Sequence, residues 1–457
     1  MSAKRHKSQG NLERRRQVKA GSHEWPQRAE AQAAAGDETD PAWTQATMEA
    51  CVATLNMREA WKRVKENDGA PGVDGLSVEA TEEKLRQHWP SIRTALLEGC
   101  YLPQAVRSVE IPKPSGGTRQ LGIPTVTDRL IQQALLQVLQ PIWDTTFHPH
   151  SFGFRPGKSA HDAVRQAQQY IQEGRKWVVD VDLEKFFDRV NHDILMERVA
   201  KRLKDKRVKG LIRRYLGAGM MQQGVKRERE EGTPQGGPLS PLLANLLLNE
   251  VDWALEARGL TFCRYADDCN VYVKSKAAAE QAMRTMRKLT GKLKLKINEA
   301  KSAVARATAR KFLGFQVWHE KSQVKLRVAT ETLQRFKTRI RQLTKRSCGR
   351  NVERLVGAEL RPYVLGWKNY FRLAQTPRKF QELDAWIRRR LRVIHLKQWK
   401  TWQAVHRNLV ARGVTPKAAE SMATNRRRYW AISAGAGLNV AFPISYFNAL
   451  GLPRLGA

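Results

Sequence analysis

The 457-residue sequence predicts an α+β fold, in which a small antiparallel sheet is backed by helices and followed by a helical C-terminal part. Two runs with strand composition predict the sheet, residues 262–265 and 270–273, which flank an Ala-Asp-Asp step typical of a hairpin turn. Residues 177–182 alternate in the manner of a further strand. Amphipathic spacing predicts C-terminal helices over residues 332–346, 351–371 and 379–396.

The first forty residues, 1–40, differ in composition from the rest of the chain. They contain few large apolar residues and several basic runs, such as residues 14–16. No apolar stretch follows those basic residues, which argues against a secretory signal. We expect residues 1–40 to form a basic and largely disordered arm.

Residues 41–150 are expected to combine helices with one β-hairpin. Apolar residues recur at helical spacing from Met48, and another helix should cover residues 83–97. A Pro-Ser-Gly-Gly turn between residues 107–112 and 118–123 then predicts the hairpin. The turn is bracketed by Lys113 and Arg119. Two cations near a hairpin tip suit a triphosphate, and a solvated basic hairpin is the alternative.

The strand at residues 177–182 carries the first candidate carboxylates and runs into a helix-like stretch, residues 186–200. Asp182 stands at the end of the strand, where its side chain can reach a cleft at the sheet edge. Asp180 points to the same face and is the rival candidate. We prefer Asp182, because Phe187, five residues later, could pack under the sugar of a bound nucleotide. A hydrogen-bonded structural carboxylate is the alternative interpretation of Asp180.

A loop rich in glycine and proline, residues 232–241, leads into an apolar stretch that predicts a buried helix. Its glycine pair permits close approaches that a side chain would block, and Gln235 lies at the tip. Ser240 followed by Pro241 predicts the helix start, with Ser240 as the N-cap. An ordinary loop before a core helix explains the helix, but it does not explain the position of Gln235.

Two adjacent acidic residues, Asp267 and Asp268, form the crest of the predicted hairpin. Adjacent carboxylates in a strand are disfavoured by propensity and by like-charge repulsion unless a cation neutralises them. Magnesium is the natural counter-ion, because it takes oxygen ligands and often brings substrate phosphates. Two-metal phosphoryl transfer needs carboxylates from at least two strands, and Asp182 supplies the other. A solvated Asp-Asp turn is the alternative.

Taken in order, these segments resemble a known family. Asp182 with Phe187, the Pro-Gln-Gly-Gly step at residues 234–237 and the Tyr-Ala-Asp-Asp step at residues 265–268 are similar to the palm of a reverse transcriptase. More narrowly, the chain resembles the reverse transcriptase/maturase encoded within bacterial group II introns, from about Met48 onward. Further blocks match in order and spacing, at residues 69–75, 111–114, 121–124, 151–156, 298–302, 312–315 and 365–371.

The resemblance implies a right-hand polymerase with fingers, palm and thumb. The implied parts are a basic arm, the fingers, the palm, the thumb or maturase (X) helices and a short accessory, DNA-binding segment, at residues 1–40, 41–150, 151–325, 326–412 and 413–457. No His/Cys cluster of the nuclease kind follows the thumb, so the chain departs from family members that carry an HNH endonuclease.

The same resemblance implies a site for two Mg²⁺ ions and a nucleoside triphosphate. The implied catalytic residues, which also bind metal together with Leu183, are Asp182, Asp267 and Asp268. The implied nucleotide-binding residues are Lys113, Arg119, Phe187 and Gln235. Lys301, which follows a strand-like stretch at residues 293–297, is expected to be a surface lysine rather than a proton donor to pyrophosphate.

The charge of the chain predicts a polyanionic partner. It has 81 Lys and Arg against 44 Asp and Glu, a formal net charge of +37. Over half of the excess lies in residues 331–430, which hold 25 Lys and Arg and 6 Asp and Glu, a net charge of +19. We expect this region to bind RNA through its phosphates and 2′-hydroxyls, with Arg388, Arg389 and Arg390 among the contacts. The arm at residues 1–40 either contributes further contacts to RNA or serves only to keep the chain soluble.

The implied partners are intron RNA or another RNA template, a DNA primer and target DNA, and deoxynucleoside triphosphates, with no protein partner required. No apolar run is long enough to span a bilayer. Five cysteines without a Cys-x-x-Cys pair predict the reduced thiols of a cytosolic protein. We expect a bacterial cytoplasmic protein in a ribonucleoprotein with intron RNA.

Two alternative functions stay open. The first is a splicing-only, RNA-binding maturase that keeps the polymerase fold. Its mark would be loss of the metal carboxylates, and Asp182, Asp267 and Asp268 are all present. The second is a group II-like reverse transcriptase recruited to phage defence or CRISPR spacer acquisition. Such proteins often lack the maturase-like thumb or carry fused domains, and this chain shows neither departure.

Overall fold

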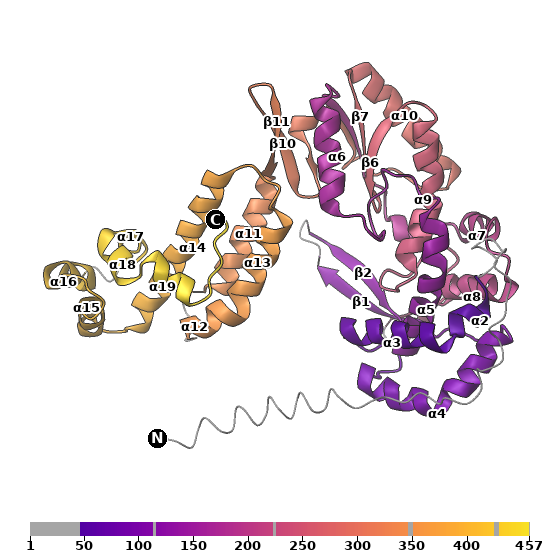
Figure 1. Ribbon diagram of the computed structural model, residues 1–457, viewed down its shortest axis with the longest axis horizontal. Helices are drawn as coiled ribbons and strands as arrows, with labels where there is room; N and C mark the ends of the chain where they lie inside the picture. Colours follow the sequence, from indigo (N-terminus) through magenta and orange to yellow (C-terminus); the bar gives the residue numbers. More distant parts are fainter. Residues whose placement is uncertain (1–45, 113–115, 223–224, 346–350, 425–428, 457) are drawn as a thin grey trace. The chain divides into compact units, whose positions relative to one another are not determined.

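The computed structural model describes residues 46–112, 116–222, 225–345, 351–424 and 429–456 (Figure 1). The expected arm at residues 1–40 and the predicted nucleotide-binding Lys113 lie outside the described residues. Helices and small sheets make up the described part, which confirms the predicted α+β class. Among these residues, no helix is both long enough and apolar enough to cross a membrane.

Helices and one β-hairpin form the first part of the described chain, as predicted. The helix expected from Met48 is divided at Ala53, whose ψ of 140° is extended rather than helical. The next helix begins at Val78, earlier than expected, because the Ser77 side chain caps it. The elements are α2 (Met48–Val52), α3 (Thr54–Asn67), α4 (Val78–Leu97), β1 (Val106–Pro112), β2 (Thr118–Ile123) and α5 (Val126–Asp144).

The hairpin belongs to a four-stranded sheet of order β2-β1-β4-β5. β1 pairs antiparallel with β2, and Pro112 lies opposite Thr118. β4 (Met220–Gln222) pairs parallel with β1 and antiparallel with β5 (Val225–Arg227). A segment that comes much later in the chain therefore completes the sheet that carries Arg119.

The sheet that carries the acidic residues has four antiparallel strands in the order β6-β7-β3-β8. Its strands are β3 (Trp177–Val181), β6 (Thr261–Tyr265), β7 (Asp268–Val273) and β8 (Ala303–Arg306). β3 is central, and Asp180 lies between Asn270 of β7 and Ala303 of β8. The strands of Asp182 and of the Asp267–Asp268 hairpin are thus direct neighbours.

The stretch at residues 293–297 has strand composition but is not a strand. It follows α10 (Lys276–Lys292), and Lys294 turns the chain with a left-handed φ of +57°. A single bridge joins Ile297 to Leu183. The edge strand is instead β8, whose short Ala-Val-Ala-Arg sequence carries little strand signal.

Side chains of the sheet alternate between two cores, one on each face. Val179 and Val181 of β3 pack in a core with residues of α5, α9 and α10, whereas Val178 packs with Tyr272 and with α6 on the other face. The stretch expected to be helical after Asp182 forms a 3₁₀ turn and then a helix. The surrounding elements are α6 (Ala160–Gln172), the 3₁₀ turn Phe186–Asp188, α7 (His192–Ala200), α8 (Lys206–Gly217) and α9 (Ser240–Glu256).

A three-stranded sheet of order β11-β10-β9 precedes the C-terminal helices. Its strands are β9 (Lys311–Phe312), β10 (Phe315–Glu320) and β11 (Gln323–Val328). The three predicted amphipathic helices are present, and the middle one contains a π-helical turn, Leu355–Leu360. The helices are α11 (Thr330–Leu343), α12 (Val352–Arg354), α13 (Arg361–Tyr370), α14 (Pro377–Gln398), α15 (Trp402–Val410), α16 (Pro416–Thr424), α17 (Tyr429–Ile432), α18 (Ala436–Ala441) and α19 (Ile444–Ala449).

Candidate active site

Asp267 and Asp268 lie at the turn between β6 and β7, as predicted. Tyr265 pairs with Asp268, so Ala266 and Asp267 form the turn between them. Ala266 has φ +57°, a left-handed conformation that costs about 1–2 kcal/mol for a residue with a Cβ. The backbone of Gly153 lies against it, since a Cβ there would be 2.3 Å from the Ala266 nitrogen. The acidic turn is therefore tight and closely packed.

Asp182 follows β3 directly and is held by the segment at residues 298–302. Its backbone N–H donates to the Ser302 hydroxyl (3.0 Å), and its carbonyl accepts from the Asn298 N–H (2.8 Å). The ammonium of Lys301 lies 3.3 Å from its carboxylate. Lys301 is mostly exposed, as expected, but it pairs with the predicted catalytic residue.

The acidic side chains influence one another electrostatically at this edge of the sheet. Although Asp268 is exposed at the sheet edge, desolvation by the surrounding protein, followed by the charges of Asp267, Asp180 and Asp182, raises its pKa to about 7. Burial also raises the pKa of Asp267, with a further contribution from Asp182. Ionisation of Asp267 and Asp268 is therefore disfavoured both by desolvation and by the neighbouring carboxylates.

The chemistry of these carboxylates fits divalent cations. Carboxylate oxygens are ligands that Mg²⁺ prefers, and a bound cation would relieve the repulsion that raises the pKa of Asp268. In the described ranges, no three His, Cys, Asp or Glu side chains stand close enough to form a ready-made metal cluster. The fit therefore rests on the donor chemistry and on the mutual repulsion of the carboxylates.

Asp180, the rival candidate, is tied into the sheet. Arg310 Nε donates to one of its oxygens (2.8 Å), while Nη2 forms an ion pair with the same oxygen (2.6 Å) and donates to the Lys301 carbonyl (2.8 Å). Asn270, with its amide turned to satisfy both polar atoms, donates to the other oxygen (3.1 Å). Burial raises the pKa of Asp180 despite the arginine. These contacts are those of a structural carboxylate, which was the alternative interpretation.

A cavity of about 960 Å³ lies beside the carboxylates and brings several predicted residues together. Arg119 and Gln235 both line it, and Arg119 Nε donates to the Gln235 side-chain oxygen. Phe187 also lines the cavity, although it packs in the core and only 9% of the residue is exposed. The predicted metal-binding residues on the same wall are Asp182, Leu183 and Asp267.

Asp268 lines a second cavity, of about 590 Å³, together with Asp180, Asp182 and Lys301. Asp182 belongs to both cavities. The acidic residues therefore stand at the boundary between two cavities, one of which contains the predicted nucleotide-binding side chains.

The sequence did not single out three arginines that line these cavities. Arg227 and Arg229 contribute to the larger cavity, and Arg310 contributes to the smaller one. Arg227 and Arg229 stand in a run of mixed charge, which is typical of a solvated surface. No local signal distinguishes them from the many other basic residues of the chain.

The glycine-rich loop brings Gln235 to the cavity through close backbone contacts. Gly232 has φ +88°, and a Cβ there would lie 2.8 Å from the Phe187 carbonyl oxygen. Gly236 has φ +132°, and its Cβ would lie 2.6 Å from the Gly122 carbonyl oxygen. Both glycines are required by position as well as by backbone conformation.

The prediction that Ser240 is the N-cap of α9 is wrong. The helix begins at Ser240 itself, and Leu239 takes the cap position with a helical backbone. The Ser240 hydroxyl donates to the Pro234 carbonyl (2.8 Å) and accepts from the Thr233 hydroxyl (3.0 Å). The serine therefore fastens the loop to the helix and does not cap the helix.

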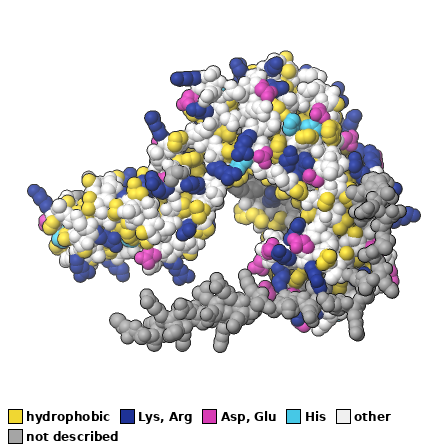
Figure 2. Space-filling model, viewed as in Figure 1, with side chains coloured by type: hydrophobic (Ala, Val, Ile, Leu, Met, Phe, Trp, Pro, Cys, Tyr) yellow, Lys and Arg dark blue, Asp and Glu magenta, His cyan; other side chains and the backbone are white. Residues whose placement is uncertain are grey.

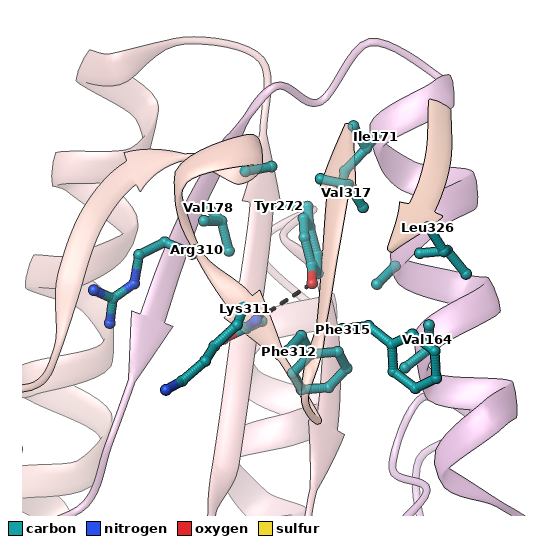
Figure 3. Close-up of a pocket in the computed structure, with 13 residues that line it drawn as sticks. Val164, Ile171, Val178, Tyr272, Arg310, Lys311, Phe312, Phe315, Val317 and Leu326 are labelled. Atoms are coloured by element: carbon teal, nitrogen blue, oxygen red, sulfur yellow. Dashed lines mark hydrogen bonds between the residues drawn. The ribbon is translucent and has the colours of Figure 1, made fainter. Parts of the chain in front are cut away.

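A small cavity of about 20 Å³ lies on the Asp180 face of the sheet (Figure 3). Most of its labelled walls are apolar side chains of α6, β3, β10 and β11, and the Tyr272 hydroxyl contacts the side-chain amide of Asn270 (3.4 Å). Figure 3 shows Arg310 and Lys311 extending away from these walls. With room for about one water molecule, the cavity is a packing feature and not a substrate site.

The three arginines predicted to bind RNA lie on α14 and are half-buried. Arg389 donates to the Trp430 carbonyl (2.6 Å), and its guanidinium lies 4.0 Å from the centre of that indole ring. Arg390 donates to the Thr344 carbonyl (2.9 Å), and burial lowers the pKa of Arg388. Arg389 and Arg390 thus join helices within the C-terminal region, and RNA binding by the three arginines stays a prediction.

Comparison with known proteins identifies two families along the chain. Residues 111–317 match the family described as reverse transcriptase (RNA-dependent DNA polymerase), and residues 333–413 match the group II intron, maturase-specific domain. Protein YkfC of Escherichia coli K12 is 36% identical over 274 residues, which cover 51% of this chain and 72% of YkfC. The group II intron-encoded protein LtrA of Lactococcus lactis subsp. cremoris is 37% identical over 197 residues, which cover 42% of this chain and 32% of LtrA.

Among solved structures, a chain of a partial Cas6-RT-Cas1–Cas2 complex matches at 26% identity. The match covers 53% of this chain and 42% of that chain, with a TM-score of 0.36. At this TM-score the match carries no argument about fold or partners.

Proposed function

Because the chain belongs to the family of group II intron-encoded reverse transcriptases and maturases, we propose that it is an RNA-directed DNA polymerase that copies intron RNA into DNA. One observation carries the proposal. Asp182 at one strand end lies near Asp267 and Asp268 on the neighbouring hairpin; Asp182 and Asp267 line the cavity of about 960 Å³, and Asp268 lines the adjoining cavity. That volume is sufficient for an incoming nucleotide.

The carboxylates of Asp182, Asp267 and Asp268, with Leu183 beside them, would hold two Mg²⁺ ions. When bound, the ions would lower the pKa of the primer 3′-hydroxyl and neutralise charge on the triphosphate and the leaving pyrophosphate. The carboxylates of Asp267 and Asp268 themselves favour cation binding, because desolvation and repulsion from neighbouring carboxylates make their ionised forms costly without a cation. Asp182 and the hairpin keep fixed positions because β3 and β7 are paired.

Arg119 and Gln235 would receive the incoming deoxynucleoside triphosphate, together with Lys113 at the hairpin tip. A guanidinium can bind two phosphate oxygens at once, and the contact between Arg119 and Gln235 orients both side chains toward the cavity. Phe187 would form the floor under the sugar, where its ring would exclude a 2′-hydroxyl.

The C-terminal region would bind RNA. We propose the division inferred from the sequence, with fingers at residues 41–150, palm at 151–325, thumb or maturase helices at 326–412 and a DNA-binding segment at 413–457. The net charge of +19 in residues 331–430 supports binding to the phosphates of the RNA backbone. Through it the protein would assist intron splicing and mobility, acting on intron RNA, a DNA primer and target DNA in a bacterial cytoplasmic ribonucleoprotein. No further protein partner is required for this function.

A primer-extension assay tests the proposal. The full chain is incubated with a DNA primer annealed to an RNA template, the four deoxynucleoside triphosphates and Mg²⁺, and a matched reaction contains EDTA. We expect full-length DNA with Mg²⁺ and none with EDTA. Tight binding of structured intron RNA without any extension would reject the polymerase and support the splicing-only alternative.

A further inference from the structure

A buried arginine stands directly before the acidic turn. Arg264 on β6 is 2% exposed and forms an ion pair with Asp252 on α9, which is fully buried. Arg264 Nη2 donates to one Asp252 oxygen (2.6 Å), and Nε donates to both oxygens (2.8 and 3.0 Å). A buried charge pair is tolerated only when its remaining N–H groups also find acceptors. The acceptors used here connect this pair to the site.

The remaining nitrogen of Arg264 joins the turn to the helix. Nη1 donates to the carbonyl of Ala266, the left-handed residue of the turn, and to the side-chain oxygen of Asn245 on α9 (both 2.9 Å). Asn245 is 1% exposed, and its amide nitrogen donates to the Gly153 carbonyl (2.8 Å). Because the backbone of Gly153 also lies against the Ala266 nitrogen, the turn is hydrogen-bonded at its carbonyl and closely packed at its nitrogen.

This network is separate from the lining of the site. Neither Arg264 nor Asn245 lines the two cavities beside the carboxylates, among the residues described there. Their influence on Asp267 and Asp268 passes through the backbone of the turn. α9 also follows the loop that carries Gln235, so the network connects the turn to the helix behind the nucleotide side of the cavity.

We infer that Arg264 and Asn245 are positioning residues for nucleotide transfer, which hold the Ala266 backbone so that Asp267 and Asp268 stand at a fixed separation from Asp182. The inference rests on the proposed polymerase function. A network that only stabilises the fold would change activity in proportion to the folded fraction. A positioning network changes the turnover number, while substrate binding and the folded fraction are largely kept.

The test compares two asparagines on α9, Asn245→Ala and Asn249→Ala. Asn249 is the matched control, because its side chain also bonds two backbone groups, the Thr146 carbonyl (3.1 Å) and the His148 N–H (3.0 Å), away from the turn. Single-nucleotide addition is measured on a saturating RNA template and DNA primer. We expect kcat to fall by about 100-fold in Asn245→Ala, as for a displacement of roughly 1 Å, with the KM for the nucleotide within about threefold.

The control should keep its kcat within about threefold of the parent. The Mg²⁺ concentration for half-maximal rate should rise in Asn245→Ala alone, because that variant loosens the turn that bears two of the carboxylates. Thermal melts establish the folded fraction of each variant. If Asn245→Ala does not fold, Asn245→Asp replaces it, since this change keeps the shape and the acceptor for Arg264 but removes the donor to Gly153.

Hydrogen–deuterium exchange of residues 265–269 provides a readout that needs no polymerase activity. Exchange there should be faster in Asn245→Ala than in the parent and unchanged in Asn249→Ala. Unchanged exchange at the turn, or equal losses of kcat in both variants, would overturn the inference. A parent protein that adds no nucleotide would instead overturn the proposed function, whatever the exchange at the turn.

Discussion

The acidic sheet edge and the basic C-terminal helices use charge in opposite ways. At the sheet edge, a few carboxylates lie near one another, and desolvation together with their mutual repulsion raises the pKa of Asp268 to about 7. In residues 331–430, 25 Lys and Arg are spread over several helices, and Figure 2 shows such side chains distributed over that region with few acidic ones between them. Where a site depends on a few carboxylates, the loss of any one of them should abolish activity. Where binding depends on many basic residues, the loss of one should weaken it only slightly. The two regions should therefore respond differently to substitution.

The largest effect is expected at the sheet edge. Asp267→Asn removes a proposed metal ligand and should lower primer extension by about a thousandfold or more, while RNA binding changes little. Extension is measured on an RNA template, and binding is measured by filter retention. Asp188→Asn is the control, because Asp188 lines the same cavity outside the carboxylate cluster. If Asp267→Asn extended the primer at nearly the parental rate, the proposal that Asp267 is an essential metal ligand would be wrong.

A smaller effect is expected when several basic residues change at once. Changing Arg388, Arg389 and Arg390 together to Gln should weaken intron RNA binding and lower the slope of log affinity against log salt by about three. Nucleotide addition on a saturating short primer-template should suffer less.

The control for this change in charge replaces exposed lysines of α10 and the turn after it, Lys288, Lys292 and Lys294, by Gln. Because Arg389 and Arg390 also join helices, melts must accompany the measurement. An unchanged salt slope would place the RNA contacts elsewhere and show that these three arginines serve only the packing of helices.

The wall of the nucleotide cavity should show an effect of about tenfold. Phe187→Ala should admit ribonucleotides, because the ring that crowds the 2′ position is lost, and the ratio of kcat/KM for deoxy- over ribonucleotides should fall by about that factor. Phe187 also packs in the core, so the variant should lose about 3–5 kcal/mol of stability and is assayed at low temperature. If the variant discriminated against ribonucleotides as strongly as the parent, Phe187 would not be the residue that excludes the 2′-hydroxyl, and its neighbour Phe186 would be the next candidate.

The smallest effect concerns pH. Without metal, the pKa of Asp268 is about 7 in the folded protein and lower in the unfolded chain, so the folded protein retains a proton that the unfolded chain releases. This residue therefore lowers stability as pH rises from about 4 to about 7. Mg²⁺ offsets that loss, and the rise in Tm that it causes should be about 2–4 °C larger at pH 8 than at pH 5.5. Asp268→Asn should abolish the difference between the two pH values.

Much of the fold and the centre of the site could be predicted from local patterns. The hairpin of Asp267 and Asp268 and the C-terminal helices follow from periodicity and turn composition, which are properties of short segments. β8 escaped prediction because its four residues become a strand only by pairing with β3. The roles of Arg264 and Arg310 could not be predicted for a similar reason, because they depend on partners that are not neighbours in the sequence.

The position of β3 at the centre of its sheet has a consequence for synthesis of the protein. Asp182 is translated early, but its neighbouring strands β7 and β8, and the Arg310 that ties Asp180, are translated much later. Such non-local pairing cannot form in a nascent chain that lacks those segments. A ribosome-bound chain that still lacks β7 and β8 therefore cannot assemble the acidic edge of this sheet.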